Sequence, residues 1–77
     1  MRPNEIRDHL RKRPFEPIRI FLSDGSSYDV RHPETAFVTQ REVVIGLDPG
    51  EDELPDRSAY CDPMHVTRIE PIDREPL

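Results

Sequence analysis

Cys61, Asp62 and His65 are the residues whose types and spacing come nearest to a catalytic site. A thiolate beside an imidazole is a nucleophile–base pair, and such a pair needs a third group that orients the imidazole. The alternative is structural, because a cysteine that ends a strand is more often a small buried apolar residue. We follow the structural interpretation and predict no catalytic residue and no enzymatic activity. A thiol enzyme built on Cys61 would show itself by rapid alkylation of the folded chain.

The groups that could bind a metal are too few. Cys61 with His65, or His32 with Glu34, supply at most two ligands each, whereas a structural zinc takes four. The acidic segment at residues 48–56 lacks the alternating ligand spacing of an EF-hand and contains two prolines. With only three glycines, the chain has no glycine-rich motif that could cradle a phosphate. We therefore expect no metal site and no cofactor.

The basic side chains gather at the N-terminus, although the whole chain has a net charge of -5. Residues 1–20 hold six basic and three acidic side chains, while residues 48–77 hold three and nine. A nucleic-acid-binding domain usually carries a positive net charge, so this balance disfavours nucleic acid as a partner. Most aromatic side chains are also expected in the core, namely Phe15, Tyr28, Phe37 and Tyr60. RNA binding remains the alternative function, through a basic face of Arg7, Arg11, Lys12, Arg13 and Arg19.

These residues must be positioned by local elements, and the first of them is a short helix over residues 3–12. Pro3 suits the first helical turn, where its missing N–H costs nothing, and Pro14 ends the helix. Ile6 and Leu10 are four residues apart and therefore share one face. A helix of this length is not stable alone in water, so we expect it to dock through these two side chains.

The next segment predicts a β-hairpin with a defined register. Apolar residues alternate on both sides of a Ser-Asp-Gly turn: Ile18, Ile20, Leu22, Tyr28 and Val30. A three-residue loop with Gly25 in the left-handed conformation pairs Ile20 with Tyr28 and keeps the apolar residues on one face. The same register sets Arg19 opposite Asp29, which is a favourable cross-strand pair.

Four further strands are predicted at residues 35–39, 43–47, 58–61 and 65–70. Between them lies a mobile acidic loop at 48–57, and a frayed tail follows at 72–77. The chain of 77 residues is thus expected to be a single domain that is mainly β, with a barrel at about 17–70. Because closure removes the free edges of a bent sheet, we predict a small SH3-like or Sm-like β-barrel of about five strands.

Phe21 departs from this pattern, since strand alternation points it away from Ile18 and Ile20. Either the docked helix covers Phe21, or the ring is exposed. An exposed ring beside open strand edges would make a partner-binding or self-assembly surface.

Three segments carry a resemblance to known proteins: Pro14–Gly25, Tyr28–Glu34 and His65–Pro71. They resemble a set of small uncharacterised bacterial proteins, chiefly from planctomycetes, that share the proline-bracketed strand, the Leu-Ser-Asp-Gly turn and the His-Pro-Glu break. The likeness covers nearly the whole chain and implies an intact fold, but it brings no activity with it.

A weaker likeness is to the bacterial Sm-like RNA chaperones, which share the N-terminal helix, the first hairpin and a last strand that ends like Ile69-Glu70-Pro71. Their Tyr-Lys-His signature is replaced here by the segment Cys61–His65, in which Asp62 brings a negative charge. This resemblance implies a ring-forming barrel, whereas the RNA-binding residues do not transfer.

The remaining features bear on location and partners. A single cysteine suits a reducing cytoplasm. The longest uncharged run is residues 35–40, against about 20 apolar residues for a membrane span, and residues 1–13 lack the apolar core of a signal peptide. We therefore expect a cytoplasmic, non-enzymatic β-module that binds another protein or its own copies and does not contact a membrane.

Overall fold

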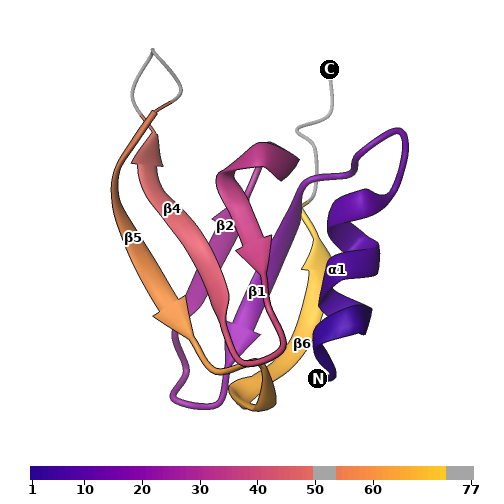
Figure 1. The fold of residues 1–77 in the computed structure, drawn as a ribbon, viewed down its shortest axis with the longest axis vertical. Helices are drawn as coiled ribbons and strands as arrows, with labels where there is room; N and C mark the ends of the chain where they lie inside the picture. The colour runs from indigo at the N-terminus through magenta and orange to yellow at the C-terminus, as the bar shows by residue number, and fades with distance from the viewer. Residues whose placement is uncertain (50–53, 73–77) are drawn as a thin grey trace.

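The chain forms one helix, six strands and two 3-10 turns within the residues that the computed structural model describes, 1–49 and 54–72 (Figure 1). In chain order they are α1 (Pro3–Arg11), β1 (Ile18–Leu22), β2 (Ser27–Val30), η1 (Pro33–Thr35), β3 (Ala36–Val38), β4 (Val43–Pro49), β5 (Pro55–Cys61), η2 (Pro63–His65) and β6 (Val66–Pro71).

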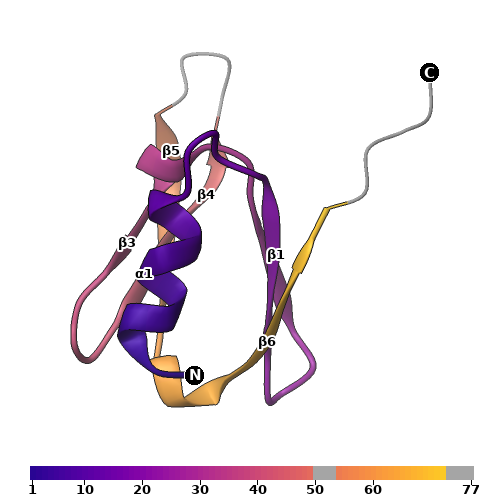
Figure 2. The same cartoon turned by 90° about the vertical axis from the view of Figure 1, so that its right-hand side faces the viewer.

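The strands are arranged in two antiparallel three-stranded sheets, with the orders β2-β1-β6 and β3-β4-β5. Figure 2 shows the two sheets facing each other, with α1 along one open side between them. A mainly β protein with one N-terminal helix is therefore confirmed. The structure has six strands instead of about five, and no closed barrel is formed by the described part of the chain. The prolyl turn η1 separates β2 from β3, since Pro33 has no N–H for a ladder.

Helix α1 forms where the sequence predicts it and is one residue shorter. The backbone N–H of Arg2 donates to Glu5 Oε1 at 3.0 Å, and Pro3 occupies the first helical position. The helix ends at Arg11 because Lys12 is already extended. Ile6 and Leu10, the two buried residues of α1, belong to the core.

The first hairpin has the predicted register. Ile18 pairs with Val30 and Ile20 with Tyr28, and the Leu22 N–H donates to the Ser26 carbonyl at 2.9 Å. Gly25 closes the loop at a φ of +90°, in the region that favours glycine.

The predicted cross-strand ion pair also forms on this hairpin. Arg19 Nε donates to Asp29 Oδ1 at 2.7 Å and its Nη2 donates to Oδ2 at 3.1 Å, which is a bidentate geometry. The bonds from Arg19 lower the pKa of Asp29 below its usual value.

The two long strands of the second sheet extend into the predicted acidic loop. β4 continues to Pro49 and β5 begins at Pro55, and these two prolines pair across the ladder. The loop expected at 48–57 is therefore shorter, and its centre, residues 50–53, lies outside the described residues. At the other end, the Ile72 N–H donates to the Pro17 carbonyl at 3.1 Å, while the rest of the expected tail, residues 73–77, also lies outside them.

The core lies between the sheets and under the helix. It consists of eight buried apolar side chains, drawn from α1 and from both sheets: Ile6, Leu10, Ile18, Ile20, Val30, Val43, Ile45 and Val66. Burial of each such side chain contributes about 1.5–3 kcal/mol. The amino group of Met1 adds a polar contact, because it donates to the carbonyls of Pro63 and Val66, each at 2.9 Å. This contact attaches the start of the helix to η2 and β6.

Replacement of Gly25 tests the loop geometry. A Cβ at this position meets no atom within 4 Å, so the Gly25→Ala variant changes only the backbone preference. We expect a loss of about 1–2 kcal/mol in the free energy of unfolding, measured by urea titration. Gly25→Asn should lose less, because asparagine adopts left-handed conformations more readily. Equal stability of Gly25→Ala and the wild type would contradict the positive φ.

The Arg19–Asp29 pair predicts a pH dependence of stability. A carboxyl group whose pKa is lower in the folded than in the unfolded chain stabilises the fold above its unfolded pKa, and the effect is lost as the pH falls through the folded value. Asp29→Asn should therefore lower the free energy of unfolding by about 0.2–1 kcal/mol at pH 7, which is the range measured for exposed ion pairs, and by less at about pH 3. Urea titrations at both pH values measure this difference. Asp8→Asn, an equal charge change on the exposed side of α1, is the control and should show a smaller dependence.

Candidate functional site

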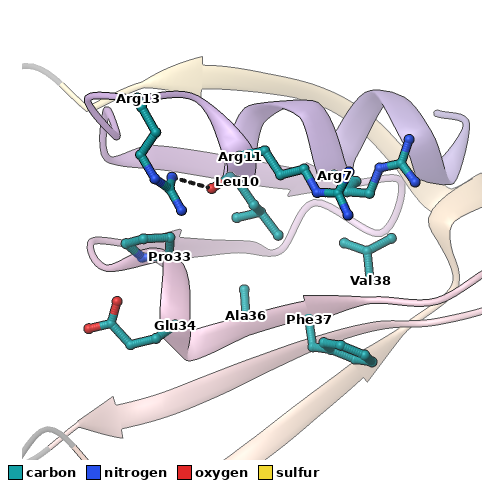
Figure 3. Close-up of a pocket in the computed structure, with 9 residues that line it drawn as sticks. All are labelled: Arg7, Leu10, Arg11, Arg13, Pro33, Glu34, Ala36, Phe37 and Val38. Carbon is teal, nitrogen blue, oxygen red and sulfur yellow. Dashed lines mark hydrogen bonds between the residues drawn. The ribbon is translucent and has the colours of Figure 1, made fainter.

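A groove lies between α1 and β3 (Figure 3). Its volume is about 340 Å³. The groove is lined by three groups of residues. They are the arginines Arg7, Arg11 and Arg13, the apolar residues Leu10, Pro33, Ala36 and Val38, and on the opposite rim Glu34 and Phe37.

The helix supplies one wall of this groove. Arg7 and Arg11 are one turn apart and lie on the same side of α1 (Figure 3). The buried Leu10 lies between Arg11 and Arg13 in this view and faces β3. Ala36 and Val38 complete the floor, because both are half-buried and pack against the core.

Arg13 follows the end of the helix and is held by its carbonyl groups. Its Nη1 donates to the Leu10 carbonyl at 3.1 Å and to the Lys12 carbonyl at 2.9 Å. Among residues 1–49 and 54–72, neither Arg7, Arg11 nor Arg13 has an acidic side chain within ion-pair distance. The helix wall of the groove is thus positively charged, and no carboxylate of the described residues forms an ion pair with it; Glu34 lies on the opposite rim.

The structure brings three of the five predicted basic residues together and separates the other two. Lys12 forms an ion pair with Glu16, and Arg19 lies on the first sheet in its bond with Asp29. The basic face expected from the sequence is therefore divided between α1 and β1.

Phe21 is half-buried on the face of β1 opposite to the core, as its strand parity predicts. The helix does not cover it, because Ile6 and Leu10 pack on the inner face with Ile20. The guanidinium of Arg68 lies over the ring instead, 3.8 Å from its centroid. This cation–π contact shields part of the surface that the sequence proposes for partners.

Two other aromatic side chains form the exposed surface that sequence reasoning missed. Phe37 is 66% exposed and Tyr60 is 69% exposed, although both were expected in the core. Phe37 pairs with Val44 and Val44 with Tyr60, so the three side chains form a row across the outer face of the second sheet. The signal was available in the alternation of Ala36, Phe37 and Val38, but a wholly apolar run does not show which face is buried.

Asp62 and His65, which with Cys61 come nearest to a catalytic site in the sequence, are engaged in local structural bonds. Ser23 Oγ lies 3.1 Å from His65 Nδ1, and Asp62 Oδ1 accepts from the Met64 N–H at 2.9 Å, which caps η2. Asp24 Oδ1 accepts from the hydroxyl and the N–H of Ser26, and these bonds lower the pKa of Asp24. None of these contacts orients His65 toward Cys61.

Cys61 itself is half-buried at the end of β5. Burial raises the pKa of its thiol, and the negative charge of Asp24 raises it further. The thiol is therefore protonated at neutral pH, which is the opposite of what a nucleophile requires.

The described parts of the chain, residues 1–49 and 54–72, also bear on metal ligation and membrane insertion. Within them, no three His, Cys, Asp or Glu side chains are grouped closely enough to hold a metal ion. No helix there has the length and apolar character needed to cross a bilayer.

The raised pKa of Cys61 predicts slow alkylation. In the folded chain at about pH 8, iodoacetamide should react with Cys61 several-fold more slowly than in urea, because burial limits both access and ionisation. Asp24→Asn should increase the rate in the folded chain, since it removes the carboxylate that opposes the thiolate. Mass spectrometry of timed samples measures both rates. A folded chain that reacts faster than the unfolded chain would restore the thiol-enzyme hypothesis.

Comparison of the chain with protein-family models, with curated proteins and with solved structures found no match. The resemblances drawn from its sequence therefore stay predictions.

Proposed function

We propose that the protein is a small non-enzymatic module that assembles with its own copies through the outer face of the second sheet. The observation that carries this proposal is the row of Phe37, Val44 and Tyr60, in which both rings are more than half exposed on β3 and β5, on either side of β4. Exposed aromatic side chains that lie together are typical of protein–protein interfaces.

The geometry of the sheet favours pairing with an identical face. Two copies related by a twofold axis would pack their sheets face to face, and each row would cover the other. Ser58 lies on the same face and is small, so it leaves room for the rings of the second copy. Removal of one aromatic ring from water contributes up to about 3 kcal/mol to the free energy of association, and a pair of copies would bury four rings, two from each copy.

We also infer the finer fold type under this proposal. β2 and β3 correspond to the two halves of one long bent strand that η1 interrupts, and the single turn η2 precedes the last strand. The two sheets are thus connected as in an opened SH3-like or Sm-like barrel. A ring assembled through strand edges is the other assembly mode that this fold type permits. The cytoplasmic location stays a prediction from the single cysteine.

RNA binding has less support as a function. Lys12 and Arg19 are paired away from the groove, and the chain carries a net charge of -5. The three remaining arginines form a short wall beside one exposed ring, Phe37, whereas single-stranded nucleic acid is usually bound on a longer series of stacking platforms.

The double substitution Phe37→Ser with Tyr60→Ser tests the self-assembly. Because both rings would be lost from each copy, the dissociation constant should rise by at least about tenfold. Sedimentation equilibrium over a concentration series measures it for both chains. The variant should keep the wild-type stability within about 1 kcal/mol, since neither ring is buried in the monomer.

Phe21→Ser is the matched control for the same experiment. It removes a ring from the outer face of the first sheet and should leave the association unchanged if the second sheet forms the interface. A wild-type chain that stays monomeric up to about 1 mM would overturn the proposal. An association that is insensitive to Phe37 and Tyr60 but lost in Phe21→Ser would move the interface to the first sheet.

A further inference from the structure

We propose that the groove between α1 and β3 binds an extended acidic peptide segment of another protein. Carboxylates of the peptide contact Arg7, Arg11 and Arg13, and one apolar side chain rests on the floor at Leu10. This inference is independent of the self-assembly proposed above, which uses the outer face of the second sheet and shares only Phe37 with the rim of the groove.

The first support is the uncompensated charge of the helix wall. Arg7 and Arg11 are separated by four residues on one side of α1, and like charges at this spacing repel each other. No carboxylate in residues 1–49 or 54–72 lies within ion-pair distance of either guanidinium. An acidic ligand would relieve this repulsion, and the chain would gain interactions that it does not make by itself.

The second support is the orientation of Arg13. Nη1 donates both of its hydrogens to backbone carbonyls, at 3.1 Å to Leu10 and at 2.9 Å to Lys12. The Nε–Nη2 edge has no acceptor within the described chain, and Figure 3 shows the guanidinium between the end of α1 and Pro33. A carboxylate binds such an edge through two parallel hydrogen bonds. Because Arg13 is already held in place, binding costs little of its conformational freedom.

The third support is the combination of charge with an apolar floor. Leu10, Ala36 and Val38 form the floor, and the volume of about 340 Å³ lies within the range of ligand sites, about 300–1,000 Å³. Glu34 lies at the end of the groove near Pro33 and repels acidic residues there. The preferred peptide therefore turns its carboxylates toward the three arginines and places a neutral or basic residue beside Glu34 on the opposite rim.

A peptide fits these features better than a nucleic acid. A nucleotide strand carries a phosphate at every step, so it would place negative charge against Glu34 and near a body of net charge -5. A peptide carries charge only where its sequence has Asp or Glu, and its apolar side chains match the floor.

The experiment is a titration of the isotope-labelled full chain, observed by NMR, with three probes. They are a blocked peptide in which Asp and Glu flank one Leu, the same peptide with Asn and Gln in place of its acids, and a single-stranded uridine oligonucleotide. We expect the acidic peptide to shift the amide signals of Leu10, Ala36 and Val38, with an affinity that falls as salt is added. The amide peptide should bind at least about tenfold more weakly.

Two variants of equal charge separate the groove from general electrostatics. The double variant Arg7→Gln with Arg11→Gln should bind the acidic peptide at least about tenfold more weakly than the wild type. The control Lys12→Gln with Arg41→Gln removes two charges outside the groove, one just after α1 and one between β3 and β4, and should change the affinity by less than about threefold. All four side chains are exposed, so thermal unfolding should show that each variant folds.

Three outcomes would overturn the proposal. They are no binding of the acidic peptide up to about 1 mM, equal binding of the acidic and amide peptides, and tighter binding of the oligonucleotide than of the acidic peptide. The last result would identify the groove as a nucleic-acid site. A negative result for peptide binding does not affect the proposal of self-assembly, because self-association is measured with other variants and without a peptide.

Discussion

The insertion of Ile6 and Leu10 between the two sheets is the contact on which the rest of the structure depends. Each sheet has only three strands and one apolar face, and no ladder joins the sheets within the described chain. The helix completes the core along the open side and contributes two of its eight buried side chains. Without this contact one side of the core between the sheets would be open to water, and a chain of this size has little other buried surface to offset that loss.

Local features of the fold were predictable because neighbouring residues determine them. The pairing of Ile20 with Tyr28 follows from side-chain alternation together with the turn at Gly25, which adopts a positive φ. The bidentate pair of Arg19 and Asp29 follows from that register. Helix α1 was predictable for the same reason, since its prolines mark both ends and its two apolar residues share a face.

Features that depend on distant parts of the chain were not predictable. The proline- and acid-rich segment after Leu47 suggests a loop, but β4 and β5 extend into it because each supplies the partner that the other needs. Phe37 lies in an apolar run whose buried face is decided by the position of α1, which the run itself does not contain. The gathering of Arg7, Arg11 and Arg13 beside β3 likewise arises from helix docking, and their spacing in the sequence indicates only a basic segment.

The floor of the groove has a consequence for the energetics of the whole chain. Leu10, Ala36 and Val38 belong to the contact that holds the helix against the second sheet, so the groove exists only while that contact is made. Any molecule that occupies it binds the folded state and not the unfolded one, and thermodynamic linkage then raises the stability of the fold by an amount that grows with the ratio of ligand concentration to dissociation constant. The same linkage acts in reverse: conditions that loosen α1 also lower the affinity of the groove. Recognition and folding are therefore one coupled equilibrium in this small protein.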